Sequence, residues 1–212
     1  MAKTENVESI EIPQIDPKIA YITIIGDSDL VLNKMDDVTA RELIDARKDK
    51  AKSLDKPNKW EKIITSIHWR DGKPKVFTEE SLYDALEHNA PCITSFGLKK
   101  SLGEAVVRNE ISKYSTKFDA CVNFMAPGGL IPIKFTEYHQ DEMLMSPKKG
   151  APVLVTLNRF SGWSATFAIN YIEKAYSLAQ IVNIINLAGF GIGIGSGRRS
   201  SGNGRYHVVD VK

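Results

Sequence analysis

The chain has 212 residues, of which 42% are hydrophobic and 25% are charged, as is ordinary for one globular domain that buries its core without disulfide or metal staples. The formal net charge of +2 neither requires nor excludes a nucleic-acid partner, so the distribution of charge has to decide. No window approaches the about 18 apolar residues of a membrane span, and the opening segment MAKTENVESIEIPQIDP lacks the apolar stretch of a secretory signal, so we expect a cytoplasmic protein without membrane contact.

The first part of the chain predicts an arm, a buried strand and a charged helix. Residues 1–18 are polar and contain two prolines, which indicates an extended N-terminal arm. The apolar run IAYITIIG at 19–26 predicts a buried strand, with a short continuation at 30–32. A helix over 39–53 is expected to begin at Thr39, which stands three residues before a glutamate as in a capping box.

Three further elements follow before the middle of the chain. Residues 62–69 predict a short helix or strand, which periodicity alone does not separate. Thr78 is followed by two glutamates and is expected to cap a helix. Another helix is predicted over 95–114, where apolar residues share one face. These elements predict a helical insertion around 36–115.

The second half changes to a strand-rich pattern. Its apolar runs, separated by glycine and proline turns, predict strands over 118–125, 130–138, 153–160 and 163–171. The last of these alternates apolar and polar residues with period two, which is typical of a strand with one buried face. Its short spacing from the strand before it predicts that the two form a hairpin.

A capped helix and a final strand complete the chain. Ser177 and Gln180 form a capping box, and an apolar stripe continues to Gly189, which stands where a helix-terminating glycine belongs. A strand is predicted over 206–211. This order is half of a split βαβ unit. The predicted fold class is therefore α+β, a ferredoxin-like or RRM-like antiparallel sheet with helices on one face and the inserted helical region, within one domain over 19–212.

The run GFGIGIGSGRRSSGNGRY at 189–206 carries the strongest functional signal. Seven glycines accompany three arginines, and four basic residues oppose Asp210 alone between Gly189 and Lys212, a local charge of +3. Glycines allow successive backbone amides to face an anion, and guanidinium groups bind phosphates with two hydrogen bonds. The predicted nucleic-acid-binding residues are Gly193, Gly195, Gly197, Arg198, Arg199, Gly202, Gly204 and Arg205, together with Lys148 and Lys149 from an earlier loop.

Three known nucleotide-binding motifs do not fit the glycine run. No lysine stands where a Walker A loop needs one, the order helix–glycines–strand is the reverse of a dinucleotide fingerprint, and the chain ends too soon for a kinase-type loop. A flexible surface loop of low complexity remains an alternative. Against it, Phe190, Ile192 and Ile194 alternate with glycine, which would suit a packed strand or bulge with mobility confined to 196–203.

The helix, the GxGxG run, a basic spacer, a second GxG and an aromatic strand resemble the glycine-rich loop of the RAMP superfamily, the Cas5, Cas6 and Cas7 types of CRISPR proteins. The stretch 163–211 is also similar to phage-encoded proteins with a WSAT-type strand and an AGFGIGIG-type turn. The resemblance is weak over 19–35 and absent between. It implies a ferredoxin-like or RRM-like domain that binds RNA, in the cytoplasm of a bacterial host. No histidine lies near the first strand and helix, where processing nucleases of the superfamily keep a general base.

The sequence is compatible with three functions. The leading hypothesis is non-catalytic binding of single-stranded RNA or DNA through the loop, by a protein that forms homo-oligomers along the strand. The alternative is a phage-encoded interaction module, or an inhibitor that mimics a CRISPR subunit and binds a host or phage protein complex. The third is a nuclease with an aspartate–histidine site. No cofactor is expected.

The sequence assigns no catalytic residue and no metal site. The four histidines form no HxH or HExxH pattern, and the two cysteines form no CxxC pair. Asp27 and Asp29 flank a turn, where paired carboxylates can hold a cation but more often shape the turn itself. Since bases stack on exposed rings, the aromatic candidates are Trp60, Trp69, Phe77 and Tyr206, whereas Trp163 and Phe167 are expected in the core.

Overall fold

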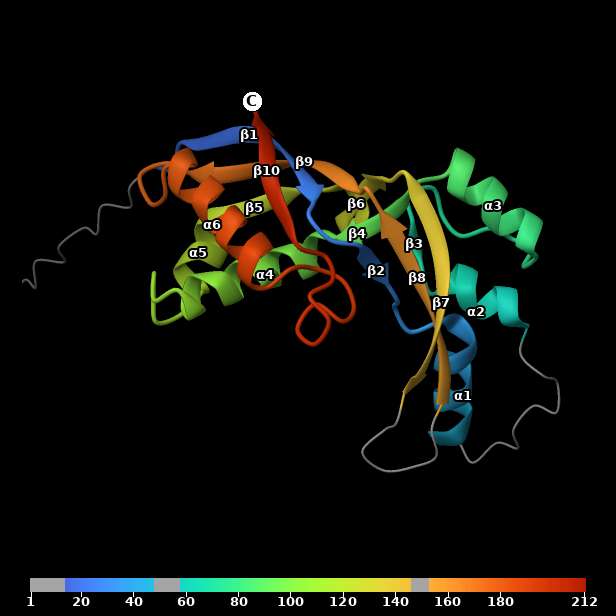
Figure 1. Ribbon diagram of the computed structural model, residues 1–212. Helices are drawn as coiled ribbons and strands as arrows, with labels where there is room; N and C mark the ends of the chain where they lie inside the picture. The colour runs from blue at the N-terminus through green and yellow to red at the C-terminus, as the bar shows by residue number, and fades with distance from the viewer. Residues whose placement is uncertain (1–13, 48–57, 146–152) are drawn as a thin grey trace, which may run out of the picture.

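The computed structural model describes residues 14–47, 58–145 and 153–212. Most of the predicted N-terminal arm lies outside these residues, as do Lys148 and Lys149. The strands form two sheets that lie side by side, each covered by helices (Figure 1). The division into an arm over 1–18 and one domain over 19–212 stays a prediction.

The larger sheet contains the predicted antiparallel arrangement. Its first four strands in spatial order are β10 (Tyr206–Val211), β1 (Pro17–Gly26), β9 (Ser164–Ile172) and β5 (Val122–Met125). Helices α4 (Ser95–Arg108) and α6 (Leu178–Gly191) contact each other below these strands, with α5 (Thr116–Cys121) beside them (Figure 1). The chain order β1-α4-β5-β9-α6-β10 is that of a ferredoxin-like unit.

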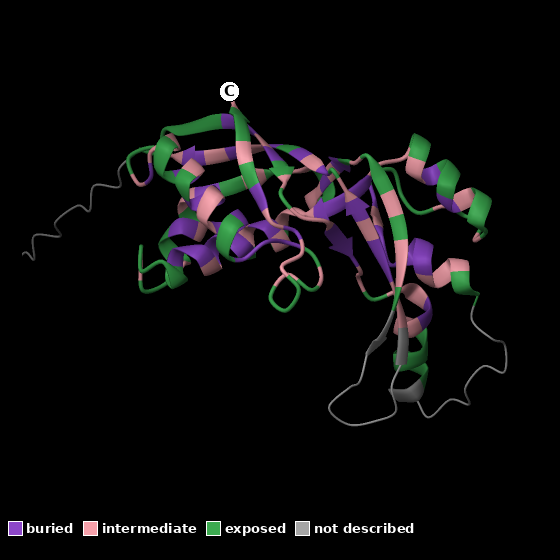
Figure 2. Cartoon of the chain, viewed as in Figure 1, coloured by how far each residue is buried: buried purple, intermediate pink, exposed green. Residues whose placement is uncertain are grey.

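The alternation of side chains explains why the helices cover one face only. In β9, Ala165, Phe167 and Ile169 are at most 5% exposed, while the residues between them face the other side. On β1, Ile22 and Ile24 are buried in the same way, and Tyr21 and its outward neighbours stay exposed. Figure 2 shows the same division, with buried positions concentrated between the sheet and the helices.

The rest of the structure lies between β1 and α4 or between β5 and β9 in the chain. Strands β6 (Leu130–Lys134), β4 (Pro91–Thr94) and β3 (His68–Trp69) extend the larger sheet. The smaller sheet has the order β2 (Leu30–Leu32), β8 (Val153–Ser161) and β7 (Glu137–Met145). The remaining helices lie on the right-hand side of Figure 1, near the smaller sheet. They are α1 (Asp37–Arg47), α2 (Lys59–Thr65) and α3 (Glu79–His88).

Three predictions about strands were wrong. The single strand expected over 130–138 is divided between β6 in the larger sheet and β7 in the smaller sheet. Residues 118–121 belong to helix α5 and only 122–125 form a strand, because Phe118 points from the helix into the core. The predicted hairpin between 153–160 and 163–171 does not form: β8 pairs with β7 and β2, whereas β9 pairs with β1, β5 and β6. The turn at Gly162, with φ of +57°, moves the chain from one sheet to the other.

Helix boundaries also shifted. The helix predicted to begin at Thr39 begins at Asp37, because the Asp36 carboxylate accepts hydrogen bonds from the Thr39 amide and hydroxyl. The helix predicted over 95–114 ends at Arg108. The capping boxes at Thr78 and Ser177 are present, the first closed by Ser81 and the second confirmed with Gln180. Among the described helices, none combines the length and hydropathy needed to cross a bilayer.

Candidate nucleic-acid interface

The glycine-rich segment begins as a continuation of helix α6. The helix runs past the predicted stop at Gly189 and ends at Gly191. Gly189 instead allows close contact with β10, because a Cβ there would lie 1.8 Å from the Tyr206 carbonyl oxygen. The left-handed residue that ends the helix is Gly193, with φ of +73°, whose amide donates to the Ala188 carbonyl. Alternation with glycine therefore does not mark a strand here.

The segment is held in place at both of its ends. Ile192 and Ile194 are 3% and 2% exposed and belong to the core. The Ser101 hydroxyl of α4 donates to the Gly193 carbonyl at 2.8 Å, and the Ile194 amide donates to the Gly204 carbonyl. Arg205 continues the attachment, since its carbonyl accepts from the amide of Asp27. The alternative hypothesis from the sequence, a flexible surface loop, therefore does not apply to the whole length of this segment.

The middle of the segment is bound to residues 28–33 at the start of the smaller sheet. The Ser196 amide donates to the Val31 carbonyl and the Gly204 amide to the Asp29 carbonyl, each at 2.8 Å. The Arg205 amide donates to the Ser28 hydroxyl. The sequence predicted that loop amides would face an anion, but these amides donate to acceptors inside the protein. The cationic groups of the loop are the side chains of its arginines.

Two arginines of the loop meet a carboxylate of helix α4. Glu104 Oε1 lies 2.9 Å from Arg199 Nη2 and 2.6 Å from Arg108 Nη2, and Glu104 Oε2 lies 3.5 Å from Arg198 Nη2. Partial burial disfavours the charged carboxylate, but the hydrogen bond from Arg199 and the neighbouring positive charges hold the pKa of Glu104 below its usual range. Three guanidiniums and one carboxylate leave this group, the Glu104 cluster, with a net charge of +2.

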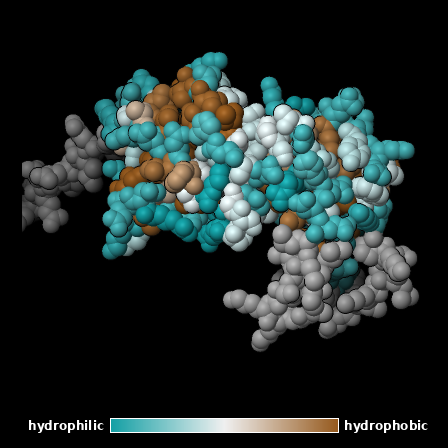
Figure 3. All heavy atoms as spheres, viewed as in Figure 1, coloured by the Kyte–Doolittle hydropathy of each residue, from teal (hydrophilic) through white to brown (hydrophobic). Residues whose placement is uncertain are grey.

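The Glu104 cluster borders an open hollow. A surface depression of about 330 Å³ is lined by Lys100, Gly197, Arg198, Arg199 and Ser200. The side chain of Arg199 is 64% exposed there, whereas that of Arg198 is 17% exposed. In Figure 3 the pale surface of the glycine-rich loop lies beside strongly hydrophilic side chains. The predicted pair Arg198 and Arg199 is thus brought together, with Lys100 added from α4.

Arg205 lies apart from this pair, at the junction with β10. Its backbone is tied to Ser28 and Asp27 on the other side of the loop. Its Nη1 atom is buried and has no hydrogen-bond partner among the described residues. A buried guanidinium nitrogen without an acceptor is unfavourable, so an anion that reached this nitrogen would relieve a cost already present in the fold.

The first half of the loop closes a separate cavity. Gly195 and Ser196 line a space of about 190 Å³ together with Lys34 and His68. Burial, reinforced by the charge of Lys34, lowers the pKa of His68, so its imidazole is neutral at neutral pH. The cavity therefore offers one cation and several hydrogen-bonding groups beside the glycine-rich segment.

The remaining polar candidates are used in pairs. Asp27 Oδ1 lies 2.6 Å from His207 Nδ1, a hydrogen-bond distance. Asp29 Oδ2 lies 3.4 Å from Arg159 Nη1. Asp141 is also paired with Arg159. Among the residues that the structure describes, no three His, Cys, Asp or Glu side chains are grouped so that they could hold a metal ion.

The aromatic candidates are only partly exposed. Trp69 and Tyr206 are 4% and 1% exposed and belong to the core, so the prediction that bases could stack on them is wrong. Trp60 and Phe77 are half-buried against the core. Trp163 is buried as expected, with its Nε1 donating to the Ser28 carbonyl at 2.8 Å.

Sequence reasoning missed the contribution of helix α4. Glu104 and Arg108 are four residues apart, which is a recognisable helical ion-pair spacing. Nothing in that spacing indicated that Arg198 and Arg199, more than 90 residues later, would share the same carboxylate. Lys100, one helical turn before Glu104, was missed for the same reason.

The architecture is similar to that of solved structures. A chain of type III-B Cmr-beta bound to cognate target RNA, solved by cryo-electron microscopy, matches with a TM-score of 0.52 and 14% identity, over 92% of this chain and 60% of that one. The two chains share an α+β fold with a ferredoxin-like antiparallel sheet, which confirms the predicted fold class. The present chain spans 60% of the length of the Cmr-beta chain that it matches.

A crystal structure of Cmr6 from Pyrococcus furiosus matches more weakly, with a TM-score of 0.39 and 10% identity, over 92% of this chain and all of that one. At that score the likeness carries no further conclusion. No family model matches this chain, and no curated protein does.

Proposed function

We propose that this protein binds single-stranded nucleic acid through its glycine-rich loop and does not cleave it. The observation that carries the proposal is the Glu104 cluster, because one carboxylate cannot neutralise the guanidiniums of Arg108, Arg198 and Arg199. A phosphate backbone that passes the hollow beside Arg199 would meet a fixed excess of positive charge. The Cmr-beta structure of similar fold, solved with target RNA, is consistent with an RNA partner.

The ion pairs favour binding rather than oppose it. Each guanidinium has five N–H donors in a planar fork, and the contacts to Glu104 use only one nitrogen of each arginine. The carboxylate therefore fixes the direction of the side chains while leaving further donors for a phosphate. Pre-ordered cations lose less conformational entropy on binding than mobile ones do. The loop glycines contribute by their shape, since they let the loop fold onto residues 28–33.

The test is a salt series with the full chain. Binding of end-labelled single-stranded oligonucleotides, one of RNA and one of DNA, is measured by fluorescence anisotropy at increasing salt concentrations. If two phosphates contact Arg198 and Arg199, the double variant Arg198→Ala/Arg199→Ala should lower the slope of log K against log salt by about 1.4. The matched control Arg41→Ala/Arg70→Ala removes two exposed arginines from other elements.

The outcomes separate cleanly. Equal loss in both double variants would mean that the protein binds through general charge and not through the loop. Undetectable binding to RNA and DNA at low salt would overturn the proposed function. Gel analysis of the same mixtures tests the absence of cleavage: accumulation of shorter fragments, abolished by His207→Ala, would favour a nuclease with the Asp27–His207 pair instead. Stepwise larger complexes on longer strands would support assembly of copies along the strand.

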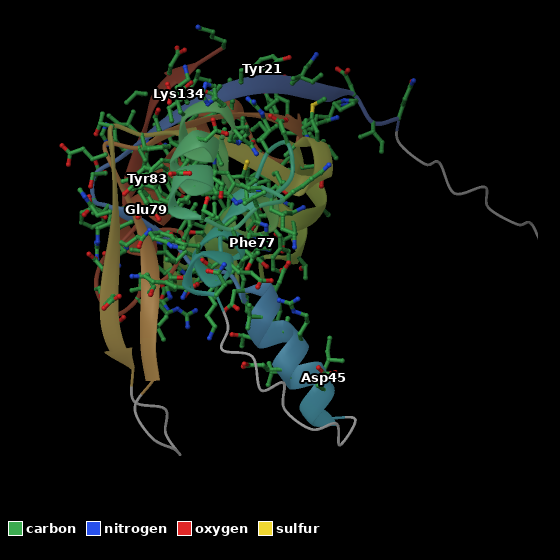
Figure 4. The ribbon with its side chains drawn as sticks, turned by 90° about the vertical axis from the view of Figure 1, so that its right-hand side faces the viewer. Tyr21, Asp45, Phe77, Glu79, Tyr83 and Lys134 are labelled. Carbon is green, nitrogen blue, oxygen red and sulfur yellow. The ribbon has the colours of Figure 1, made fainter. Side chains whose placement is uncertain are left out.

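A contact with another protein is the second candidate, and one feature favours it. The face of the larger sheet opposite the helices exposes apolar side chains on β1 and β10, including Ile19 at 54%, Tyr21 at 57% and Val209 at 49%. Figure 3 shows hydrophobic surface around β10, and Figure 4 shows Tyr21 at the outer side of β1. An inhibitor or assembly module of phage origin would use such a face. Capture of a host complex that survives nuclease treatment and is lost in Tyr21→Glu would support it.

A further inference from the structure

We propose that helix α4 carries a base-stacking groove that continues the phosphate path of the loop, with Phe96 as the platform on which a nucleotide base stacks. The inference rests on the proposed function and deepens it, because it names where the bases of a bound strand would lie. The groove has a volume of about 600 Å³ and is lined by residues of α4 and α5 and by Arg199 of the loop.

The groove follows one side of the helix. Phe96, Lys100, Gly103 and Val107 recur at intervals of three and four residues, which places them along one stripe of α4. Between Phe96 and Val107 the helix axis rises by roughly 16 Å, which gives room for more than one nucleotide. Gly103, facing the Ser115 side chain, keeps the floor of the groove low between the two larger apolar residues.

The apolar residues of this stripe are unusually accessible. Phe96 is 76% exposed although it begins a helix that otherwise packs into the core, and Val107 is 43% exposed. On the opposite side of the same helix, Leu98, Leu102 and Ala105 are at most 1% exposed. The exposure of Phe96 therefore does not follow from a loosely packed helix, and an accessible ring beside cations is what single-stranded nucleic acids bind.

The charges around the groove select a polyanion. The cations at its wall and rim are Lys99, Lys100, Arg108, Arg198 and Arg199, and the anions are Glu104 and Asp119. The balance is +3. Lys99 is already held by the Asp119 carbonyl at 2.7 Å and by Asn123, so it braces the wall. Lys100 and Arg199 line both the groove and the neighbouring hollow, and thus connect the two.

This charge excess decides between occupants. An apolar peptide helix could use Phe96 and Val107, but it would bury Lys100 and Arg199 without compensation. A phosphodiester strand satisfies both kinds of group, because its phosphates pair with the cations while its bases cover the apolar side chains. The geometry therefore points to a single strand whose backbone passes Arg199 and Lys100 and whose base turns toward Phe96.

The test separates stacking from charge. Full-length protein is titrated with end-labelled oligouridine, and in parallel with an abasic strand of equal length that keeps the phosphates. Phe96→Ala should weaken binding of oligouridine by about five- to a hundredfold and leave binding of the abasic strand unchanged. Phe96→Tyr, which keeps an aromatic face, should restore binding. Circular dichroism at increasing temperature checks that each variant is folded.

Phe190→Ala is the matched control, since Phe190 is an exposed phenylalanine on α6 that does not line the groove. Equal loss in Phe96→Ala and Phe190→Ala, or unchanged oligouridine binding in Phe96→Ala while Arg198→Ala/Arg199→Ala binds weakly, would overturn the groove and leave the proposed function standing. Absence of binding by the unmodified protein would remove both. Photocrosslinking of bromouracil-substituted RNA should give a peptide that contains Phe96; crosslinks only elsewhere would also overturn the groove.

Discussion

Glu104 connects the loop to helix α4 through charge, and its protonation should weaken the fold. Its pKa is below the usual range, because the hydrogen bond from Arg199 and the charges of Arg108 and Arg198 outweigh partial burial. A carboxyl whose pKa is lower in the folded than in the unfolded chain stabilises the fold above its unfolded pKa. This contribution is lost as the pH falls through the folded value.

We therefore expect Glu104→Gln to lower the free energy of unfolding by roughly 2 kcal/mol at neutral pH. The loss should shrink as the pH falls below the ordinary range of a glutamate, because the unmodified carboxylate is then progressively protonated. Urea denaturation at several pH values measures this. Glu87→Gln, at an exposed position on α3, is the control and should be nearly neutral. A loss for Glu104→Gln that does not change with pH would show that shape rather than charge holds the contact.

The two cysteines should differ in reactivity. Burial raises the pKa of the fully buried Cys92 thiol to about 11, so roughly one thousandth of it is ionised at pH 8. Cys121 is half-buried on α5. Alkylation of the native protein, followed by mass spectrometry, should modify Cys121 first and Cys92 only under unfolding conditions. Equal rates for both thiols would contradict the burial of Cys92 in β4.

At the scale of elements, the glycines of the loop should fall into two groups. Gly204 has φ of +66°, and a Cβ there would lie 1.9 Å from the Ile194 carbonyl oxygen. Gly202 has nearly the same φ, +67°, but open space around it. Backbone strain of about 1–2 kcal/mol is common to both substitutions, whereas the steric overlap belongs to Gly204 alone.

Gly204→Ala should therefore lower the free energy of unfolding by about 3 kcal/mol or more, and Gly202→Ala by about 1 kcal/mol. Gly191→Ala is expected to raise it by up to about 1 kcal/mol, because Gly191 is helical and its Cβ would meet nothing. Urea denaturation of the three variants gives the order. Equal losses at Gly204 and Gly202 would mean that the loop is not packed as described.

Elements with a clear period and a local start signal could be predicted from the sequence. Strand β1, strand β9 and helix α6 are of this kind. A run of apolar β-forming residues indicates β1, alternation indicates β9, and a capping box with an apolar stripe indicates α6. Residues 118–121 could not, because an apolar run of that length suits a short helix as well as a strand. The pairing of β8 with β7 and β2 was missed because strands of adjacent sequence usually pair, and here Gly162 redirects the chain.

At the scale of the whole molecule, the two sheets share one core. The buried side chains form a continuous cluster that extends from Trp69, beside α2, to Trp163, between β1 and the loop. From the sequence, only the α+β fold class of this core could be predicted. The Glu104 cluster could not be predicted, because the packing of α4, α6 and the loop, and no local pattern, brings its arginines and its carboxylate together.

A continuous core predicts that both halves unfold together. In a Trp60→Phe background, the variants Trp69→Phe and Trp163→Phe leave one reporter in each half. After correction for the stability cost of each substitution, fluorescence and far-ultraviolet circular dichroism should give the same midpoint. The signal of Trp69 reports on the half with α2, and that of Trp163 on the ferredoxin-like half. Two separate transitions would show that the halves fold as independent units.

The attachment of the loop to residues 28–33 also has a mechanical side. The Val31 carbonyl accepts a hydrogen bond from the Ser196 amide, and Val31 belongs to β2, which pairs with β8 with Leu30 opposite Phe160. Whatever stiffens the loop must therefore stiffen the root of the long β7–β8 hairpin, which projects away from the larger sheet together with α1 and its Asp45 (Figures 1 and 4). A ligand that binds the loop should therefore slow hydrogen exchange of the backbone amides at the base of the hairpin, without contacting the hairpin itself.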